Sequence, residues 1–217
     1  MSTLNVLCYG DSNTYGTVPM EHPFHDERFD FETRWTGIAA ARLCAGFSVI
    51  EEGLPGRTTV HDDPIEGASR NGKTYLLPCL GSHKPLDAIV LTLGTNDLKT
   101  RFSVTPEDIG RSLFALVELV QQCKAGRNGG QPKLLIVAPM PIEEVSFLGE
   151  IFTGGAAKSH GLAEKYEAVA RHFSAAFLDA GTVIKVSPVD GIHFDAEQHR
   201  LLGEAVADKL RALFPSA

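Results

Sequence analysis

The stretch Leu4-Asn5-Val6-Leu7-Cys8-Tyr9, followed at once by Gly10-Asp11-Ser12-Asn13, decides the fold of this chain. The first six residues form an apolar run with the length of a buried strand, and the next four have the composition of a turn. In open α/β sheets, the turns that follow parallel strands gather at the carboxyl edge of the sheet, where ligands bind. We therefore expect Ser12 to lie at that edge.

The same alternation continues along the whole sequence. Four further runs of strand length lie at 47–51, 88–93, 134–138 and 176–178. Apolar residues with helical spacing mark the segments 35–43, 109–120, 158–173 and 196–214. This order predicts an α/β fold with a five-stranded, mainly parallel sheet that helices cover on both faces. The length of 217 residues fits one domain, which we expect to span 1–217.

Composition argues against nucleic acids and membranes as binding partners. A formal net charge of -7 and the lack of a Lys/Arg cluster argue against nucleic-acid binding. No apolar run has the length that spans a bilayer, so we expect no membrane association. Four cysteines are widely spaced without a CxxC pair, and we expect them to be reduced thiols in a cytoplasmic protein: Cys8, Cys44, Cys79 and Cys123.

Four short polar blocks carry residue types suited to one reaction. They are Gly10-Asp11-Ser12-Asn13, Gly53-Leu54-Pro55-Gly56, Gly94-Thr95-Asn96-Asp97 and Asp190-Gly191-Ile192-His193. The blocks follow the first, second, third and fifth expected strands. Since the carboxyl ends of parallel strands meet at one edge, all four blocks are expected to lie close together.

The first and last blocks supply a nucleophile and its base. A serine hydroxyl such as that of Ser12 attacks a carbonyl only when a base removes its proton. His193 is the natural base, and Asp190, three residues earlier, can bind the imidazole Nδ1–H and fix its tautomer. Asp11 also lies near the serine, but we expect it to bind loop backbone instead, and Asp195 to cap the last helix.

The blocks also supply donors for an oxyanion. We expect three: the backbone N–H of Ser12, the backbone N–H of Gly56 and the side-chain amide of Asn96. Pro55 has no N–H and is excluded. Neighbouring residues are expected to line the substrate pocket, and these are Asp11, Asn13, Tyr15, Thr95 and Ile192.

The four blocks, in this order, resemble those of the SGNH (GDSL-type) hydrolases, with Ser12, Gly56, Asn96 and His193 at the matching positions. Further stretches resemble the bacterial arylesterase/acyltransferase branch: Arg34-Trp35-Thr36-Gly37, Glu51-Glu52-Gly53-Leu54, Arg57-Thr58-Thr59, Asp62-Asp63-Pro64 and Asp190-Gly191-Ile192-His193-Phe194. The resemblance implies a three-layer αβα flavodoxin-like fold, a Ser-His-Asp triad, small acyl esters as substrates and no metal or other cofactor. It also implies a homo-oligomer, often an octamer, and possible transfer of the acyl group to alcohols or peroxide.

Two departures from this branch are visible. Asn13 stands where most members have leucine, which leaves the catalytic roles in place. Tyr15 and Thr17 stand where related acyltransferases carry tryptophans at the pocket entrance. The second departure argues against efficient acyl transfer in water.

The residues leave other functions open. A carbohydrate O-deacetylase would use the same triad on an acetylated sugar, and Trp35, Tyr15 and Asp63 suit a sugar as well as an aryl group. A thioesterase is disfavoured because no basic loop stands out to hold a phosphorylated carrier. A silent binding module is disfavoured because it would not need the complete set of catalytic residues.

Three long irregular segments, 17–32, 57–71 and 139–156, leave the same expected sheet edge. Loops of this length are usually functional or form interfaces. The last is rich in apolar residues, which we expect to be buried against a neighbouring subunit or over the site: Ile142, Val145, Phe147, Leu148, Ile151 and Phe152. Loop histidines 22, 25 and 61 have no metal-ligand spacing.

Overall fold

A computed structural model describes residues 3–215, so the expected domain 1–217 extends two residues beyond it at each end. The centre is a five-stranded sheet in the order β2-β1-β3-β4-β5, in which every neighbouring pair is parallel. The strands are β1 (Leu4–Gly10), β2 (Phe47–Gly53), β3 (Ala88–Thr92), β4 (Lys133–Ala138) and β5 (Ala176–Asp179). The predicted α/β sheet is confirmed, and its strand order is that of the flavodoxin-like folds.

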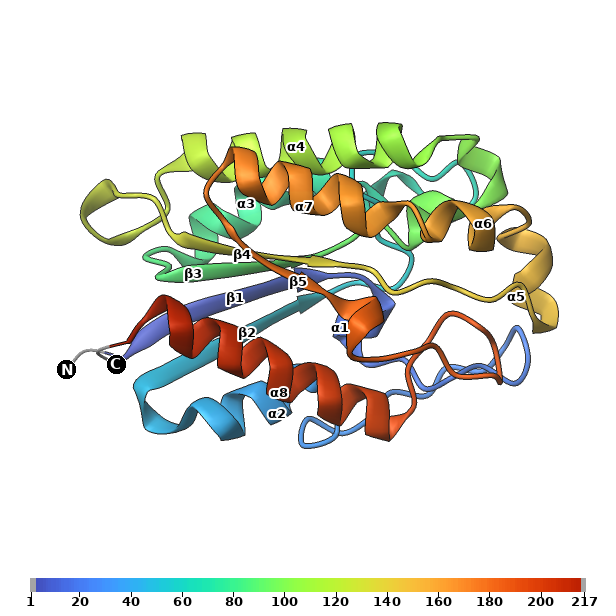
Figure 1. Ribbon diagram of the computed structural model, residues 1–217, viewed down its shortest axis with the longest axis horizontal. Coiled ribbons are helices and arrows are strands. Elements are labelled where there is room, and N and C mark those ends of the chain that lie inside the picture. Colours follow the sequence, from blue (N-terminus) through green and yellow to red (C-terminus); the bar gives the residue numbers. More distant parts are fainter. Residues whose placement is uncertain (1–2, 216–217) are drawn as a thin grey trace.

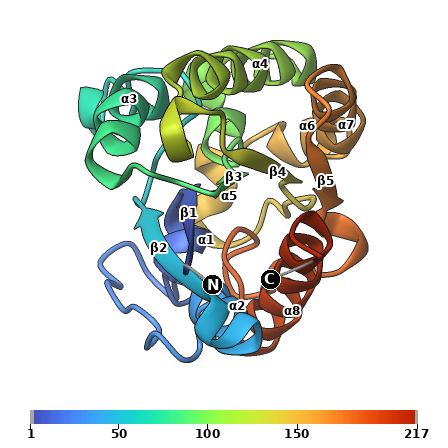
Figure 2. The same ribbon diagram turned by 90° about the vertical axis from the view of Figure 1, so that its left-hand side faces the viewer.

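Helices cover both faces of this sheet and form three layers (Figure 1). One layer contains α3 (Gly72–His83), α4 (Pro106–Cys123) and α7 (Leu162–His172). The other contains α2 (Trp35–Leu43) and α8 (Ala196–Leu213), which pack against each other beneath the sheet (Figure 2). Three short helices lie at the strand ends: α1 (Ser12–Tyr15), α5 (Ser146–Ile151) and α6 (Gly155–Ser159).

Alternation along the strands creates a separate core on each face. In β1, Leu7 and Tyr9 face α3 and α4, whereas Val6 and Cys8 face α2 and α8. This two-residue period is what a sheet covered on both sides requires, and it makes the central strands apolar throughout. Burial of whole strands fixes the register and therefore the relative height of the strand ends.

Local signals set the ends of the long helices. Thr105 and Asp108 form a reciprocal capping box at the start of α4, where Pro106 takes the first position. Asp195 accepts a hydrogen bond from the Gln198 N–H and caps α8, as expected from the sequence.

The sequence did not reveal α3, and it misplaced the start of α7. Helix α3 contains Pro78 and two glycines, and these residues break the pattern by which helices are recognised. Asn71 nevertheless caps α3, because its side chain accepts bonds from the N–H groups of Lys73 and Thr74. The segment expected as one helix over 158–173 is two, since Gly161 separates α6 from α7.

The apolar loop 139–156 folds onto its own chain. Ile142, Leu148 and Phe152 are buried in the core that also contains residues of α4 and α7. Of the six apolar residues expected in this loop, only Ile151 has an exposed side chain. Most of this segment is therefore not a free apolar patch, and it gives no support to the expected subunit contact. Within residues 3–215, no helix combines the length and apolar character needed to cross a membrane.

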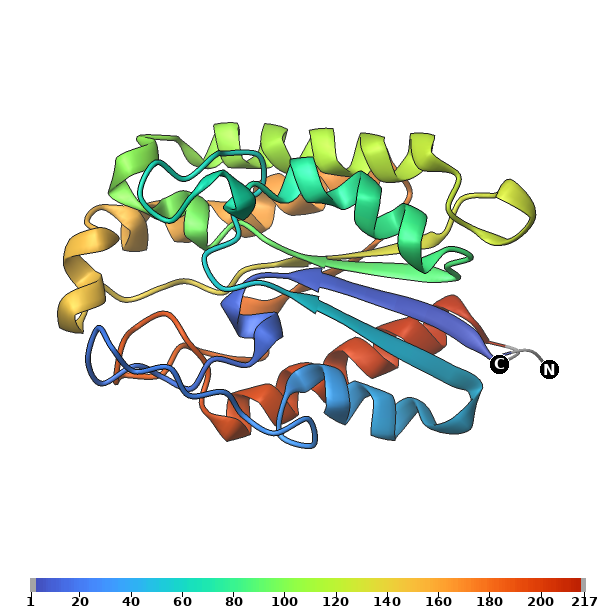
Figure 3. The same cartoon turned by 180° about the vertical axis from the view of Figure 1, so that it is seen from behind.

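The strand order reverses at β1, between β2 and β3. Figure 3 shows that α1 and the loops after β2 and β3 lie together at the carboxyl ends of these strands. Open α/β sheets bind ligands at such a switch point, where diverging loops leave a crevice. The tertiary structure thus brings the four polar blocks to one place.

Candidate active site

Ser12 begins a single tight helical turn directly after β1. The Asp11 side chain accepts a 3.0 Å bond from the Asn13 N–H and so caps α1, and Gly16 ends the turn in the left-handed conformation. A side chain at Gly10 would collide with those of Thr14 and Thr92, so glycine is required there. This packing holds the start of α1 close against the end of β3.

His193 and Asp190 complete a linear array with Ser12. The Ser12 Oγ lies 3.0 Å from His193 Nε2, and His193 Nδ1 lies 2.6 Å from Asp190 Oδ2. The other carboxylate oxygen of Asp190 accepts bonds from the N–H groups of Ile192 and His193. All three groups are buried, and Ser12 has only 7% of its surface exposed.

Hydrogen bonds keep the Asp190 carboxyl ionised. Burial alone raises its pKa, but the bonds from the His193 side chain and backbone and from the Met20 N–H outweigh burial and lower that pKa. The Met20 N–H donates at 2.7 Å to Asp190 Oδ2, so the loop 17–32 helps to hold this carboxylate in place. Met20 gave no signal in the sequence because a backbone donor can come from any residue except proline.

The first and second blocks each contain a free backbone donor. Among residues 3–215, the N–H groups of Ser12 and Gly56 have no acceptor. Gly56 has φ of +76°, a conformation that favours glycine, and a side chain there would collide with the Glu66 carboxylate. Asn96 uses one amide hydrogen to bind the Arg57 carbonyl at 3.2 Å, which leaves its second hydrogen available.

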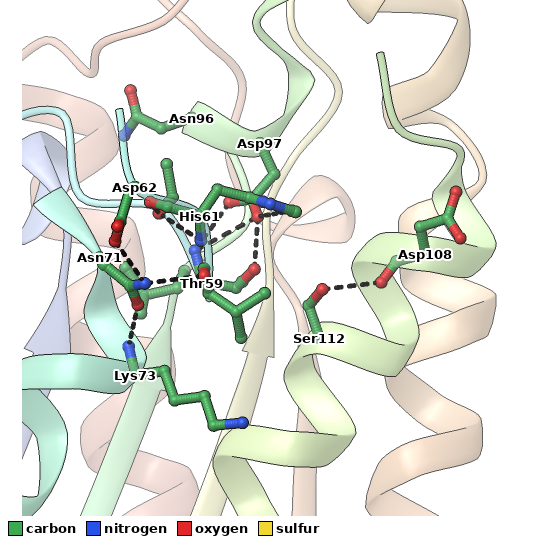
Figure 4. Close-up of polar contacts among 12 residues, drawn as sticks. Thr59, His61, Asp62, Asn71, Lys73, Asn96, Asp97, Asp108 and Ser112 are labelled. Atoms are coloured by element: carbon green, nitrogen blue, oxygen red, sulfur yellow. Dashed lines mark hydrogen bonds and ion pairs between the residues drawn. The ribbon is translucent and has the colours of Figure 1, made fainter. Parts of the chain in front are cut away.

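Asp97 joins the loop that contains Gly56 to the loop that contains Asn96 (Figure 4). Its carboxylate accepts bonds from the Thr59 N–H, at 2.9 Å, and from the Thr59 hydroxyl. Burial raises the pKa of Asp97 to about 6, although the bonds from Thr59 oppose the shift. The sequence included Asp97 in the third block but assigned it no role, since Thr59 is distant along the chain.

The expected pocket residues differ in their surroundings. Asp11, Asn13 and Thr95 are buried and line an inner cavity of about 30 Å³ beside α1. Ile192 is buried in the core, whereas Tyr15 is partly exposed under the guanidinium of Arg28, 4.0 Å from its ring. Tyr15 is thus the one member of this set whose side chain is partly exposed.

One cluster among residues 3–215 has donor atoms at a spacing that suits a metal ion. It combines Glu52 with Cys79 and His83, whose ligand atoms lie within 4.8 Å of one another. Burial raises the pKa of Cys79 to about 12, which keeps the thiol protonated, and Glu52 already binds His83 at 2.7 Å. The bond between Glu52 and His83 therefore already engages two of the three groups, and Glu52 lies on the edge strand β2.

Known proteins resemble this chain over nearly its whole length. The profile of the GDSL-like lipase/acylhydrolase family matches residues 8–201. Est24, a carbohydrate acetylesterase from Sinorhizobium meliloti, is 44% identical, with a TM-score of 0.93 over 98% of this chain and 100% of its own.

Two further solved structures are similar over the same extent. The aryl esterase of M. smegmatis is 43% identical with a TM-score of 0.93, over 98% of this chain and 100% of its own. A carbohydrate acetylesterase family member from Sinorhizobium meliloti is 34% identical with a TM-score of 0.90, again over 98% and 100%. No curated protein sequence matches the chain.

Proposed function

Because this chain belongs to the GDSL-like lipase/acylhydrolase family and is a carboxylic ester hydrolase, we propose that it hydrolyses short-chain acyl esters with Ser12 as nucleophile. The observation that carries the proposal is the array Ser12–His193–Asp190, with contacts of 3.0 and 2.6 Å. No metal or other cofactor is needed in this proposal, because the side chains themselves supply a nucleophile, a base and an orienting acid.

In the acylation step, His193 Nε2 removes the Ser12 proton as Oγ attacks the ester carbonyl carbon. The imidazolium that forms is stabilised by the Asp190 carboxylate, whose lowered pKa keeps it charged. The carbonyl oxygen becomes an oxyanion that accepts bonds from the Ser12 and Gly56 N–H groups and from the Asn96 amide. These donors are fixed before the substrate arrives, so they need no reorganisation when the charge develops.

Collapse of this intermediate breaks the bond to the leaving alcohol, which takes the proton from His193. Water then enters, gives a proton to His193 and attacks the acyl-enzyme carbonyl, which releases the acid and restores Ser12. Replacement of water by an alcohol or by hydrogen peroxide would yield a new ester or a peracid. The residues Tyr15 and Thr17 argue for hydrolysis as the main outcome.

The small exposure of the site supports a short acyl group. Ser12 and His193 have 7% and 5% of their surfaces exposed, and Asn96 has 5%. We therefore propose acetyl and similarly small acyl groups.

A second candidate is deacetylation of carbohydrates. The observation that favours it is the likeness to two proteins described as carbohydrate acetylesterases, at 44% and 34% identity. The array Ser12–His193–Asp190 would also catalyse this reaction, with a sugar hydroxyl as the leaving alcohol.

Release of p-nitrophenol from the acetate, butyrate and octanoate esters, beside release of acetate from acetylated sugars, tests both candidates. Activity that falls with acyl length and is lost in Ser12→Ala supports the ester hydrolase. Rates on an acetylated sugar above those on p-nitrophenyl acetate favour the second candidate. Activity that survives in Ser12→Ala contradicts the assignment of the nucleophile.

A further inference from the structure

The guanidinium of Arg57 is buried between the two strands that precede Ser12 and Gly56. Arg57 follows Gly56 directly, and only 2% of its surface is exposed. Its Nη1 donates at 2.9 Å to the carbonyl of Gly10, at the end of β1, and also to the carbonyl of Glu52, in β2. The side chain therefore binds the ends of the two strands that carry the first and second blocks.

Two aromatic rings hold this guanidinium in place. Its central carbon lies 4.2 Å from the centre of the Tyr9 ring and 5.4 Å from that of Tyr75. The Tyr9 hydroxyl donates at 2.7 Å to the Gly72 carbonyl at the start of α3, so this ring is itself anchored. Aromatic faces attract a cation and restrict where it can lie, and they therefore give the Arg57 side chain one position.

The backbone of Arg57 binds the side-chain amide of Asn96, the third expected donor. Its carbonyl accepts the Asn96 amide at 3.2 Å, and its N–H donates at 3.1 Å to the Leu54 carbonyl and closes the turn that contains Gly56. A single residue thus contacts the serine turn, the Gly56 turn and Asn96.

The charge of Arg57 is costly to bury. Among residues 3–215, no carboxylate oxygen lies within 4.0 Å of its nitrogens, and its Nε has no hydrogen-bond partner. Burial of an unpaired cation loses its hydration without a compensating ion pair, and a neutral donor would suffice merely to link two strands. This cost indicates that the charged side chain has a task beyond stability.

We infer that Arg57 is the positioning residue of the oxyanion hole: it sets the Ser12 N–H, the Gly56 N–H and the Asn96 amide at the mutual spacing that the tetrahedral intermediate requires. The inference rests on the function proposed above. Arg57 itself does not contact the reacting atoms. Its loss shifts donors whose placement within a fraction of an ångström determines their effect on the rate.

The test compares Arg57→Met, which keeps the apolar stem, with Arg57→Lys, which keeps the charge but lacks the planar guanidinium that lies over the Tyr9 ring. We expect kcat on p-nitrophenyl acetate to fall by about 10-fold to 100-fold in both, with little change in KM. Arg127→Met is the matched control, because Arg127 binds Asp87 at 2.6 Å beyond the opposite ends of the strands. It should keep the wild-type kcat.

A double-mutant cycle separates positioning from general loss of stability. In the Asn96→Ala background, one donor is already gone, so Arg57→Met should lower kcat by a smaller factor than in wild type. Equal factors in both backgrounds, or a kcat within twofold of wild type in Arg57→Met and Arg57→Lys, would overturn the inference.

These results are distinguishable from failure of the proposed function, in which wild type itself hydrolyses no ester. In that event, a crystal structure of Arg57→Met decides the inference. Displacement of Gly56 or Asn96 relative to Ser12 supports it, and unchanged positions of all three overturn it.

Discussion

The side-chain amide of Asn13 donates a 3.2 Å hydrogen bond to the backbone carbonyl of Ile192. The residue that follows Ser12 thereby holds the residue that precedes His193, across 179 positions of sequence. Its other atom, Oδ1, is buried without a partner among residues 3–215. The Asn13 side chain therefore links the first and last blocks. The sequence showed only that asparagine replaces the common leucine, and it gave no sign of this link.

Replacement of Asn13 by leucine is expected to leave stability nearly unchanged but to lower kcat. The variant loses one hydrogen bond but also removes a buried unpaired oxygen, so the free energy of unfolding should change by less than about 1 kcal/mol. The turn before His193 loses its tether, and kcat should fall by about 3-fold to 10-fold. Urea unfolding and ester hydrolysis measure the two effects. A large loss of stability with unchanged kcat would contradict this account.

Asp190→Asn is expected to lower kcat by about 10⁴, the size of the effect of the corresponding change in a serine protease. The amide cannot stabilise the imidazolium, and it favours the tautomer with the proton on the wrong nitrogen. Asp11→Asn is the matched control, since Asp11 is equally buried but binds the Asn13 N–H. Its kcat should fall by less than about 10-fold. Equal losses would contradict the assignment of Asp190.

Asn96→Ala tests the proposed role of the Asn96 amide as an oxyanion donor. Removal of one such donor typically lowers kcat by about 10²–10³, and KM should change little because the donor acts on the transition state. Asn5→Ala serves as control: its amide binds the Pro85 carbonyl near the amino ends of the strands, away from Ser12. Initial rates over a range of p-nitrophenyl acetate concentrations separate kcat from KM. A loss confined to KM would assign Asn96 to substrate binding instead.

Asp97 should make stability depend on pH. Burial raises its pKa in the folded chain to about 6, against 3.8 for an ordinary aspartate, so the folded state binds a proton more tightly than the unfolded state. This contribution is complete below the unfolded pKa and is lost as pH rises through about 6, with a slope of up to about 1.4 kcal/mol per pH unit.

The Asp97→Asn variant lacks this titration. The free energy of unfolding of wild type minus that of the variant should therefore fall between pH 4 and pH 6 and level off above that range. Urea unfolding at closely spaced pH values measures the difference. A constant difference across the range would show that Asp97 titrates at the same pH in both states.

The strands and three of the long helices could be predicted because each depends on a local pattern. The apolar run of β1 can be recognised as a strand without knowing which strands pair with it. The cap of α8 involves only Asp195 and the Gln198 N–H, three residues apart. Helix α3 could not be predicted, because Pro78 and its glycines hide the pattern, and its stability comes from packing of Leu76 and Leu80 in the core. Propensity is a weak guide where tertiary packing supplies the energy.

For the site, the sequence by itself determined the kinds of group and their common edge. A parallel sheet must bring the ends of its strands together, so the order of the blocks was enough to group Ser12, Gly56, Asn96 and His193. The tertiary structure alone decided how these groups are held: by Met20 on Asp190, by Asp97 on Thr59, and by Arg57 on Gly10. Such contacts join residues far apart in the chain, and their distances follow from packing and register, which no local pattern encodes.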